Sequence, residues 1–161
     1  MFPLFCCSFF LTQTDSLSQR VSSALLTAVE DRFTDEEITT EVKYLGLRVK
    51  DTCNARKENI QISFARKEDF QGPLDVTATV FDEDGQCARW RFRPQVAIWK
   101  NIPVAADAVG PGENVTVILK KERYDLVKGS LVSATGGPYI ARRNIQKGDF
   151  LTQDLLRKMP T

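Results

Sequence analysis

Apolar side chains recur along residues 16–33 at the intervals of one helical face. Val21, Leu25, Ala28, Val29 and Phe33 follow the i, i+4, i+7, i+8 spacing of an amphipathic helix. Ser16 followed by Gln19 resembles a capping box, in which each residue satisfies a backbone N–H of the other. The pattern therefore predicts a helix from Ser16 to Phe33 that covers a sheet.

After this helix the pattern changes from helical to strand-like. Apolar and polar side chains alternate over residues 59–64 and again over residues 74–80, as in strands with one buried and one wet face. The polar turn Asp82-Glu83-Asp84-Gly85 then leads into residues 86–93 as the second strand of a hairpin. Between residues 41 and 50 the alternation switches phase around Gly46, which indicates a bulge or bend. These signals predict a helix plus an antiparallel sheet.

Pro94 interrupts the strand pattern, and short apolar strands alternate with Gly/Pro turns after it. We place a domain boundary there, with an N-terminal domain over residues 19–94, a C-terminal domain over residues 95–161 and Pro94 as a hinge. A continuous strand that crosses from one sheet to the next would produce the same pattern. The predicted class is α+β and mainly β.

An internal repeat marks the second half of the chain, where residues 104–116 align without gaps on residues 140–152. Corresponding positions keep an aliphatic residue, an Ala, a second aliphatic, a Gly, an acid, a third aliphatic and a Thr. Each copy predicts a strand and then a turn, in which the Gly takes a positive φ and the acid accepts backbone N–H groups. Two such units in tandem would bury each other's open sheet edges and apolar faces.

The copies are expected to diverge after the shared Thr. In the second copy, Thr152 is predicted to cap a short helical turn in which Asp154 complements the helix dipole and residues 155 and 156 pack inward. In the first copy, Val117-Ile118-Leu119 replaces that polar start, so the chain is expected to continue as a strand.

Composition excludes several function classes. The 161 residues carry 22 Lys and Arg against 21 Asp and Glu, a net charge of +1 that argues against nucleic-acid binding. The chain has 0 His, which removes Ser-His and Cys-His catalysis and His ligation of metals. No nucleophile–base pair, phosphate loop, paired-carboxylate spacing or CxxC motif is present. We therefore predict a protein that is not an enzyme and holds no cofactor or metal.

The opening stretch MFPLFCCSFFLT is apolar over about the length of a secretory signal core and is short for a bilayer span. Small residues allow cleavage after Ser18, so residues 1–18 are interpreted as a signal-peptide-like leader of an exported protein. A positive segment before the apolar run is missing, and a buried strand is the alternative. Cleavage after Ser18 would also delete the Ser16 cap, so these two predictions compete.

Removal of the leader would leave Cys53 and Cys87 as an even pair, as expected in an oxidising compartment. A bridge between them would contribute roughly 3–4 kcal/mol on the chain-closure model. Two unpaired thiols in a reduced protein are the alternative.

Two groups of arginines are candidate partner-binding residues. Arg89, Arg91 and Arg93 alternate with Trp90 and Phe92, so a strand would place the guanidinium groups, together with Cys87, on one face. Such a basic stripe suits an acidic partner surface, although a solvated face above a core Trp is the alternative. Arg142 and Arg143 are expected on a strand, facing opposite sides, so that one of them grips a partner carboxylate.

Residues 141–155, ARRNIQKGDFLTQDL, resemble the hallmark of the SAF domain, a small β-clip module. The order of leader, helix, β-rich domain and SAF module resembles the flagellar basal-body P-ring formation protein family, and so does the tract Tyr124-Asp125-Leu126 between the repeats. The resemblance runs from about Ser16 to Pro160. Family members usually continue into a further β segment, whereas this sequence stops at Thr161, so we expect a chain truncated at its C-terminus.

The resemblance implies a periplasmic chaperone, a monomer or weak dimer, that binds flagellar P-ring protein without catalysis. It implies no nucleic-acid partner and no stable membrane insertion once the leader is removed. Because SAF modules also occur elsewhere, two alternatives stay open. One is a ligand-binding module of pilus assembly or of sugar-acid and carbohydrate recognition, and the other is a regulatory fragment of a sugar-acid enzyme.

Overall fold

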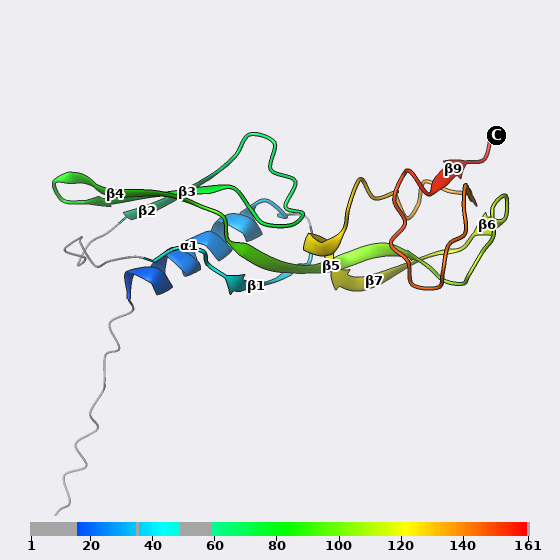
Figure 1. Ribbon diagram of the computed structural model, residues 1–161, viewed down its shortest axis with the longest axis horizontal. Helices are drawn as coiled ribbons and strands as arrows, with labels where there is room; N and C mark the ends of the chain where they lie inside the picture. Colours follow the sequence, from blue (N-terminus) through cyan, green and yellow to red (C-terminus); the bar gives the residue numbers. More distant parts are fainter. Residues whose placement is uncertain (1–15, 35, 49–58, 161) are drawn as a thin grey trace, which may run out of the picture.

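The computed structural model describes residues 16–34, 36–48 and 59–160. They form an elongated body (Figure 1), with helix α1 and strands β1–β4 at one end and strands β6, β8 and β9 at the other. We call these ends the N-terminal lobe (the described residues from 16 to 98) and the C-terminal module (residues 102–160). The long strand β5 and its neighbour β7 join the two ends. The structure is α+β and mainly β, as predicted.

Helix α1 spans Leu17–Asp31 and begins at the predicted capping box. The Gln19 N–H donates to the Ser16 hydroxyl at 3.3 Å, and the Ser16 N–H donates to the Gln19 side chain at 2.9 Å. One face of the helix is fully buried and carries Leu17, Val21, Leu25 and Val29. The predicted helix, its cap and its apolar face are confirmed, but the helix ends at Asp31, so Phe33 lies beyond it.

Three antiparallel strands form the first sheet of the N-terminal lobe: β2 (Asn59–Phe64), β3 (Val76–Asp82) and β4 (Gly85–Phe92). Alternate side chains of β3 are buried, and the β3–β4 hairpin turns at Gly85 with φ 115°. The predicted strands and hairpin are therefore confirmed.

The second sheet has β5 (Gln95–Ala105) between β1 (Thr39–Tyr44) and β7 (Val117–Arg123), and both neighbours are antiparallel to it. The register of β1 shifts between Val42 and Tyr44, so the predicted irregularity lies inside the strand. Gly46 comes after the strand and has a φ of 69°, with the Arg93 carbonyl so close that a Cβ would lie 3.0 Å from it.

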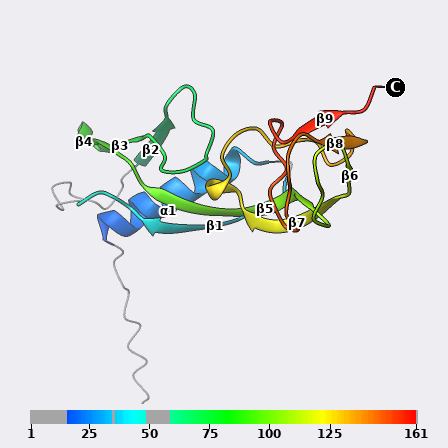
Figure 2. The ribbon, with the colours of Figure 1, turned by 45° about the vertical axis from the view of Figure 1, so that its right-hand side comes forward.

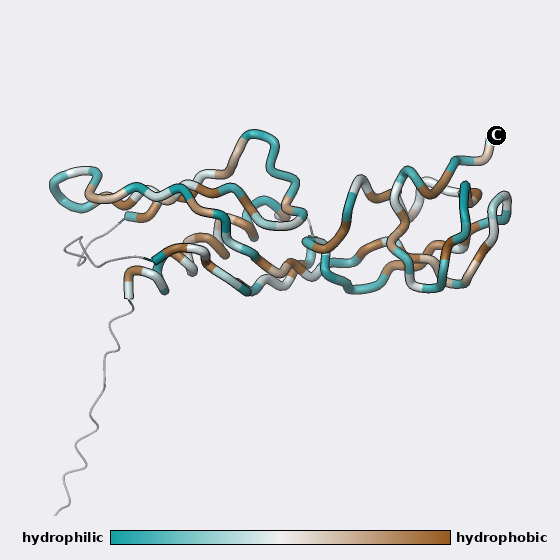
Figure 3. Tube along the Cα trace, in the orientation of Figure 1, coloured by the Kyte–Doolittle hydropathy of each residue, from teal (hydrophilic) through white to brown (hydrophobic). Residues whose placement is uncertain are grey.

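Helix α1 contacts β2 of the first sheet and β1 of the second (Figures 1 and 2). The helix therefore lies between the two sheets, and the apolar sides of all three meet in one core cluster. The tube coloured by hydropathy shows how apolar and polar positions alternate along these strands (Figure 3). Fully buried members of the cluster come from α1, β3 and β5, for example Leu25, Val80 and Ile98.

Strand β5 belongs to both ends of the molecule. Val96 and Ile98, after Pro94, lie in the core of the N-terminal lobe, whereas Ile102 and Val104 lie in a second cluster. The Pro94 carbonyl accepts a hydrogen bond from the Leu74 N–H at 2.9 Å. The strand that follows Pro94 thus serves two cores, and a domain boundary or hinge at Pro94 stays a prediction.

The two copies of the repeat lie against each other in the C-terminal module. At the centre, Val109 and Ile145 each donate an N–H to the other's carbonyl at 2.9 Å. To one side, Ala105 donates to the Asp149 carbonyl at 3.0 Å, and Gly148 donates to the Ala105 carbonyl at 2.9 Å. Through these hydrogen bonds the two units cover each other's open strand edges, as predicted.

The other side repeats this arrangement with the roles of the copies exchanged. Ala141 donates to the Glu113 carbonyl at 3.0 Å, and Gly112 donates to the Ala141 carbonyl at 2.8 Å. Here β8 (Tyr139–Ala141) pairs with β6 (Asn114–Val115) and with β9 (Leu156–Lys158). Because each bond has its counterpart in the other copy, the module has an approximate two-fold axis through the central pair.

The turns of the two copies match as well. Gly112 has a φ of 83° and Gly148 a φ of 86°, a conformation that other residues adopt at a cost. The Glu113 and Asp149 carboxylates each accept the backbone N–H three residues earlier, at 2.6 and 2.9 Å. The roles predicted for the shared glycine and acid are confirmed.

After the shared Thr the copies diverge. Thr116 leads into β7, as predicted for the first copy. Instead of the helical turn expected after Thr152, a single turn is closed by the Leu155 N–H on the Thr152 carbonyl at 3.1 Å, and the chain continues as β9. Leu155 and Leu156 pack inward, as predicted. The Thr152 hydroxyl donates to the Asp154 carboxylate, so this acid is bound within the turn.

Candidate functional site

The arginine stripe of β4 is exposed as its alternation suggests. Arg89 and Arg91 face solvent, while the alternating residues Trp90 and Phe92 pack on the core of the N-terminal lobe. The Arg91 guanidinium lies 3.3 Å from the Asp75 carboxylate, but 78% of the arginine side chain is exposed. Solvent therefore screens this pair, which leaves the guanidinium groups available to a partner.

A shallow hollow of about 240 Å³ adjoins this stripe on the sheet of β2, β3 and β4. Its lining combines two guanidinium groups, two hydroxyl groups and one carboxylate; the residues are Ser63, Phe64, Ala65, Asp75, Thr77, Arg89 and Arg91. Such a surface could receive an acidic side chain of a protein partner. A binding role for these arginines, and for the exposed Arg93, stays a prediction.

Cys87 does not share the exposed face of the arginines, and that expectation is wrong. Val80 pairs with Ala88 and Phe81 with Gln86, so Cys87 is the extra residue of a bulge. It is half-buried and packs on the core of the N-terminal lobe. Cys53 and residues 1–15 of the predicted leader (residues 1–18) lie outside the described residues, so the Cys53–Cys87 disulfide and the leader stay predictions.

Arg142 and Arg143 follow β8 rather than lying on it, because the strand ends at Ala141. The expected placement on opposite faces of a strand is therefore wrong. Both side chains are exposed, and the Arg143 guanidinium lies 3.5 Å from the Asp154 carboxylate. The hydrogen bond from Thr152, with a smaller contribution from the charges of the two arginines, lowers the pKa of Asp154.

A buried ion pair lies where the lobe and the module meet. The Asp125 carboxylate is fully buried and accepts three hydrogen bonds: from the Ile98 N–H at 3.0 Å and from the Arg123 guanidinium at 2.7 and 2.6 Å. Chiefly because of this hydrogen bonding, the pKa of Arg123 is raised. The Asp125 carbonyl also accepts the Gly72 N–H at 2.7 Å. Asp125 therefore ties β5, β7 and a loop of the N-terminal lobe together.

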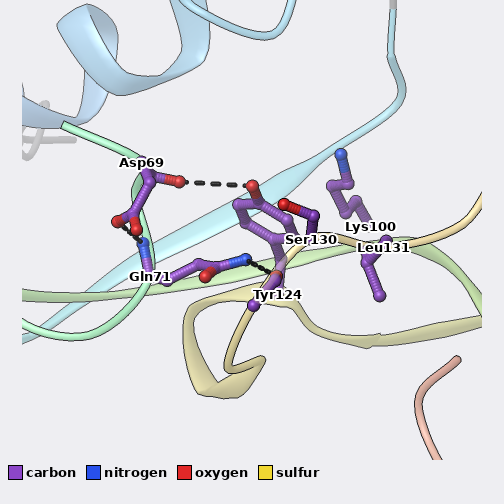
Figure 4. Close-up of a pocket in the computed structure, with 7 residues that line it drawn as sticks. Asp69, Gln71, Lys100, Tyr124, Ser130 and Leu131 are labelled. Carbon is purple, nitrogen blue, oxygen red and sulfur yellow. Dashed lines mark hydrogen bonds between the residues drawn. The ribbon is translucent and has the colours of Figure 1, made fainter. Parts of the chain in front are cut away.

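A cavity of about 460 Å³ lies beside this ion pair (Figure 4). The Tyr124 hydroxyl donates to the Asp69 carbonyl at 3.2 Å, and the Gln71 side chain donates to the Gly129 carbonyl at 2.9 Å. Both bonds cross from the N-terminal lobe to the C-terminal module. Burial raises the pKa of Tyr124. The remaining polar wall includes Lys100, whose Nζ lies 2.7 Å from Glu36 and 4.4 Å from the centre of the Tyr124 ring.

Of the residues at this junction, the sequence pointed only to Tyr124-Asp125-Leu126, and only through the family resemblance. The roles of Lys100, Arg123 and Gln71 were not predicted. A charged residue inside a mostly apolar strand, as Lys100 is in β5, was the available signal. Over residues 16–34, 36–48 and 59–160, no group of three or more acidic or cysteine side chains is placed to hold a metal ion. No helix in this part of the chain is long and apolar enough to cross a membrane.

Comparison with solved structures identifies the fold. The chain superposes on Salmonella FlgA in its closed form with a TM-score of 0.57 and 19% identity, over 87% of this chain and 69% of that one. For Salmonella FlgA in its open form the TM-score is 0.55 and the identity 18%, over 87% and 65% of the two chains. This chain has the FlgA fold. No family model and no curated protein matches the sequence.

Proposed function

We propose that this chain is a non-catalytic periplasmic chaperone that binds flagellar P-ring subunits before they assemble. The observation that carries the proposal is the pair of clasped repeat copies, joined through β5 to a helix-containing lobe in the arrangement of FlgA. The sequence resemblance to the P-ring formation family supports the same role, through the repeat motif of residues 141–155, the order of the segments and the tract Tyr124-Asp125-Leu126.

The surface of the chain supports binding rather than catalysis. The hollow beside the arginine stripe is lined by arginine, hydroxyl and carboxylate groups, and the cavity at the junction by polar groups that include Lys100, Tyr124 and Gln71; such groups suit a protein partner. The exposed arginines of β4 are the proposed contact for acidic side chains of the subunit. Such contacts at a rim affect the rate of association more than the final affinity.

We further propose that the lobe and the module change their relative position when a subunit binds. FlgA has been solved in a closed and an open form. In this chain the Tyr124–Asp69 and Gln71–Gly129 hydrogen bonds cross the junction on one side of β5. Such a movement would break these two bonds and open the cavity between them.

Deletion of the gene in its source organism tests the proposed function. We expect basal bodies without P-rings and a loss of motility, both restored by a plasmid-borne copy. Electron microscopy of isolated basal bodies and a soft-agar motility assay measure the two results. Complete rings and normal motility in the deletion strain would overturn the proposal. Heat released on titration with sugar acids would instead favour a carbohydrate-binding module.

A further inference from the structure

Strand β7 leaves one edge of the central sheet open. In the described part of the chain, β7 pairs with β5 along one side and with no strand along the other. Both figures of the ribbon show β7 along the margin of the molecule (Figures 1 and 2). An unpaired strand edge offers a row of backbone donors and acceptors to another chain.

The hydrogen bonds of β5 show which backbone groups of β7 point outward. Successive residues of a strand point their N–H and C=O to opposite edges. The carbonyls of Pro103 and Ala105 accept from Leu151 and Gly148 of the second repeat copy, at 3.0 and 2.9 Å. Val104, between them, therefore points to β7, where its partner is Ile118.

Ile118 and Lys120 consequently bond to β5, whereas the backbone groups of Val117, Leu119 and Lys121 point to the open edge. The same alternation requires the Thr116 carbonyl to point to the β5 side. It does so, because it accepts a hydrogen bond from the Ala106 N–H at 3.0 Å. Three residues thus present both a donor and an acceptor to a further strand.

The side chains of this edge combine apolar and basic character. Ile118 is 45% exposed and Leu119 57%, and as successive residues of a strand they lie on opposite faces of the sheet. Lys120 and Lys121 follow directly and are exposed. The Lys120 ammonium lies 3.2 Å from Glu122 in a largely solvated pair, and Lys121 donates to the Thr39 hydroxyl at 3.0 Å. A strand laid along β7 would cover Ile118 on one face and Leu119 on the other. It would meet the charge of Lys120 directly, and that of Lys121 once its ammonium leaves Thr39, which lies beyond β5.

This charge pattern argues against a second copy of the chain as the occupant. Antiparallel pairing of two β7 strands over their full length would centre on Lys120, which would then face its own copy. The same register would place Leu119 opposite Lys121. Like charges directly opposite each other destabilise a pair of strands, and lysines at an edge are a known protection against self-association.

We propose that the open edge of β7 binds an extended segment of the unassembled P-ring subunit, which adds as a fourth strand to the sheet β1–β5–β7. The segment presents apolar side chains to Ile118 and Leu119 and carboxylates to Lys120 and Lys121. This inference rests on the proposed function, and it names the surface through which that function acts. Backbone bonds supply the affinity of such strand addition, and the side chains supply the specificity.

Residue-resolved amide exchange of the full chain, with and without purified P-ring subunit, tests the edge directly. We expect the outward amides of Leu119 and Lys121 to exchange at least tenfold more slowly in the complex. The amides of Ile118 and Lys120 are an internal control, because β5 protects them already. Unchanged outward amides in a complex that co-elutes on size exclusion would overturn the edge proposal and leave the proposed function standing.

Two variants provide a second test by titration calorimetry with the same subunit. Leu119→Pro removes the N–H of residue 119, which points to the open edge, and removes no hydrogen bond to β5. A strand tolerates proline at such an edge position. Lys120→Glu/Lys121→Glu reverses the charges and keeps every backbone group. We expect each to bind at least tenfold more weakly than wild type, while Lys147→Glu, an exposed charge reversal in a repeat turn, binds normally.

The outcomes separate the competing explanations. Normal binding by the charge-reversed variant would overturn the proposal even if Leu119→Pro failed to fold. If the outward amides became more protected as the concentration of the chain alone was raised, this would show that a second copy occupies the edge. Absence of any complex with the wild-type chain would overturn both this inference and the proposed function.

Discussion

The two repeat copies share one motif and yet end in different structures. Their central hydrogen bonds are equivalent, and both turns use a positive-φ glycine followed by an acid. After the shared Thr, β-branched Val117 and Ile118 extend the first copy into β7, as residues with high strand propensity do. In the second copy Asp154 accepts a hydrogen bond from Thr152, and such local bonds compete with regular strands.

The shared residues therefore form the hydrogen bonds that hold the two copies together. The residues after the shared Thr decide which strand each copy forms next. The second copy turns back into β9 and closes its own small sheet. The first copy instead supplies the open edge of β7. One motif therefore provides both a stable core and a surface available to a partner.

Truncation of the third aliphatic residue of the repeat should give the largest difference in stability between the two copies. Leu151 is fully buried, whereas its counterpart Val115 is half-buried. Leu151→Ala should lower the free energy of unfolding by about 2–5 kcal/mol. Val115→Ala should cost about 1 kcal/mol, because less apolar surface is removed from the core. Urea denaturation measures both, and equal losses would contradict the difference in burial between the copies.

Substitution of the turn glycines should reveal the symmetry of the copies. A Cβ on Gly112 or Gly148 would meet no atom within 4 Å, so the backbone conformation alone sets the cost. We expect Gly112→Ala and Gly148→Ala each to lose about 1–2 kcal/mol of unfolding free energy. Thermal and urea denaturation should give matching values. If one copy tolerated the change and the other did not, the turns would not be equivalent.

The acids beside these glycines should make a smaller contribution. Glu113→Ala and Asp149→Ala each remove an acceptor for a backbone N–H. We expect a loss of about 0.5–1.5 kcal/mol for each variant. Lys147→Ala, which removes an exposed side chain from the same turn as Asp149, is the matched control in urea denaturation. A control that loses as much as the two acid variants would show that the turn bonds contribute nothing specific.

Acid titration should give the smallest effect and should involve the second copy alone. The pKa of Asp154 is lowered below its ordinary value of 3.8, chiefly by the Thr152 hydroxyl. Its carboxylate therefore stabilises the fold above that value, and the contribution disappears as the pH falls through the lowered pKa. Asp154→Asn should be slightly less stable than wild type at pH 7, and the difference should be smaller at pH 2. Circular dichroism during denaturation at the two pH values measures this, and a constant difference would contradict it.

The sequence predicted what depends on local pattern. Helix α1 with its Ser16 cap, the β3–β4 hairpin and the turns at Gly112 and Gly148 each follow from a few neighbouring residues. The bulge at Cys87 could not be predicted, because it depends on how β4 meets β3 rather than on the residues of β4 alone. In the same way, the early end of β8 before Arg142 depends on its pairing with β6 and β9.

The candidate sites show the same division. Alternation along β4 predicted the exposure of Arg89 and Arg91, a property of one strand. The buried Arg123–Asp125 pair required the packing of β5 and β7 against a loop of the N-terminal lobe. Long-range contacts of this kind leave no periodic signal in the sequence.

The two repeat copies are held together at their centre by the reciprocal hydrogen bonds between Val109 and Ile145, and the architecture of the module depends on this pair. Couplings across hydrogen bonds in the NMR spectrum of the labelled protein test it most directly. The account predicts a coupling from the Val109 amide nitrogen to the Ile145 carbonyl carbon and the reciprocal coupling from Ile145 to Val109. Coupling of either amide to a different carbonyl, or rapid exchange of both amides in the folded protein, would contradict the account.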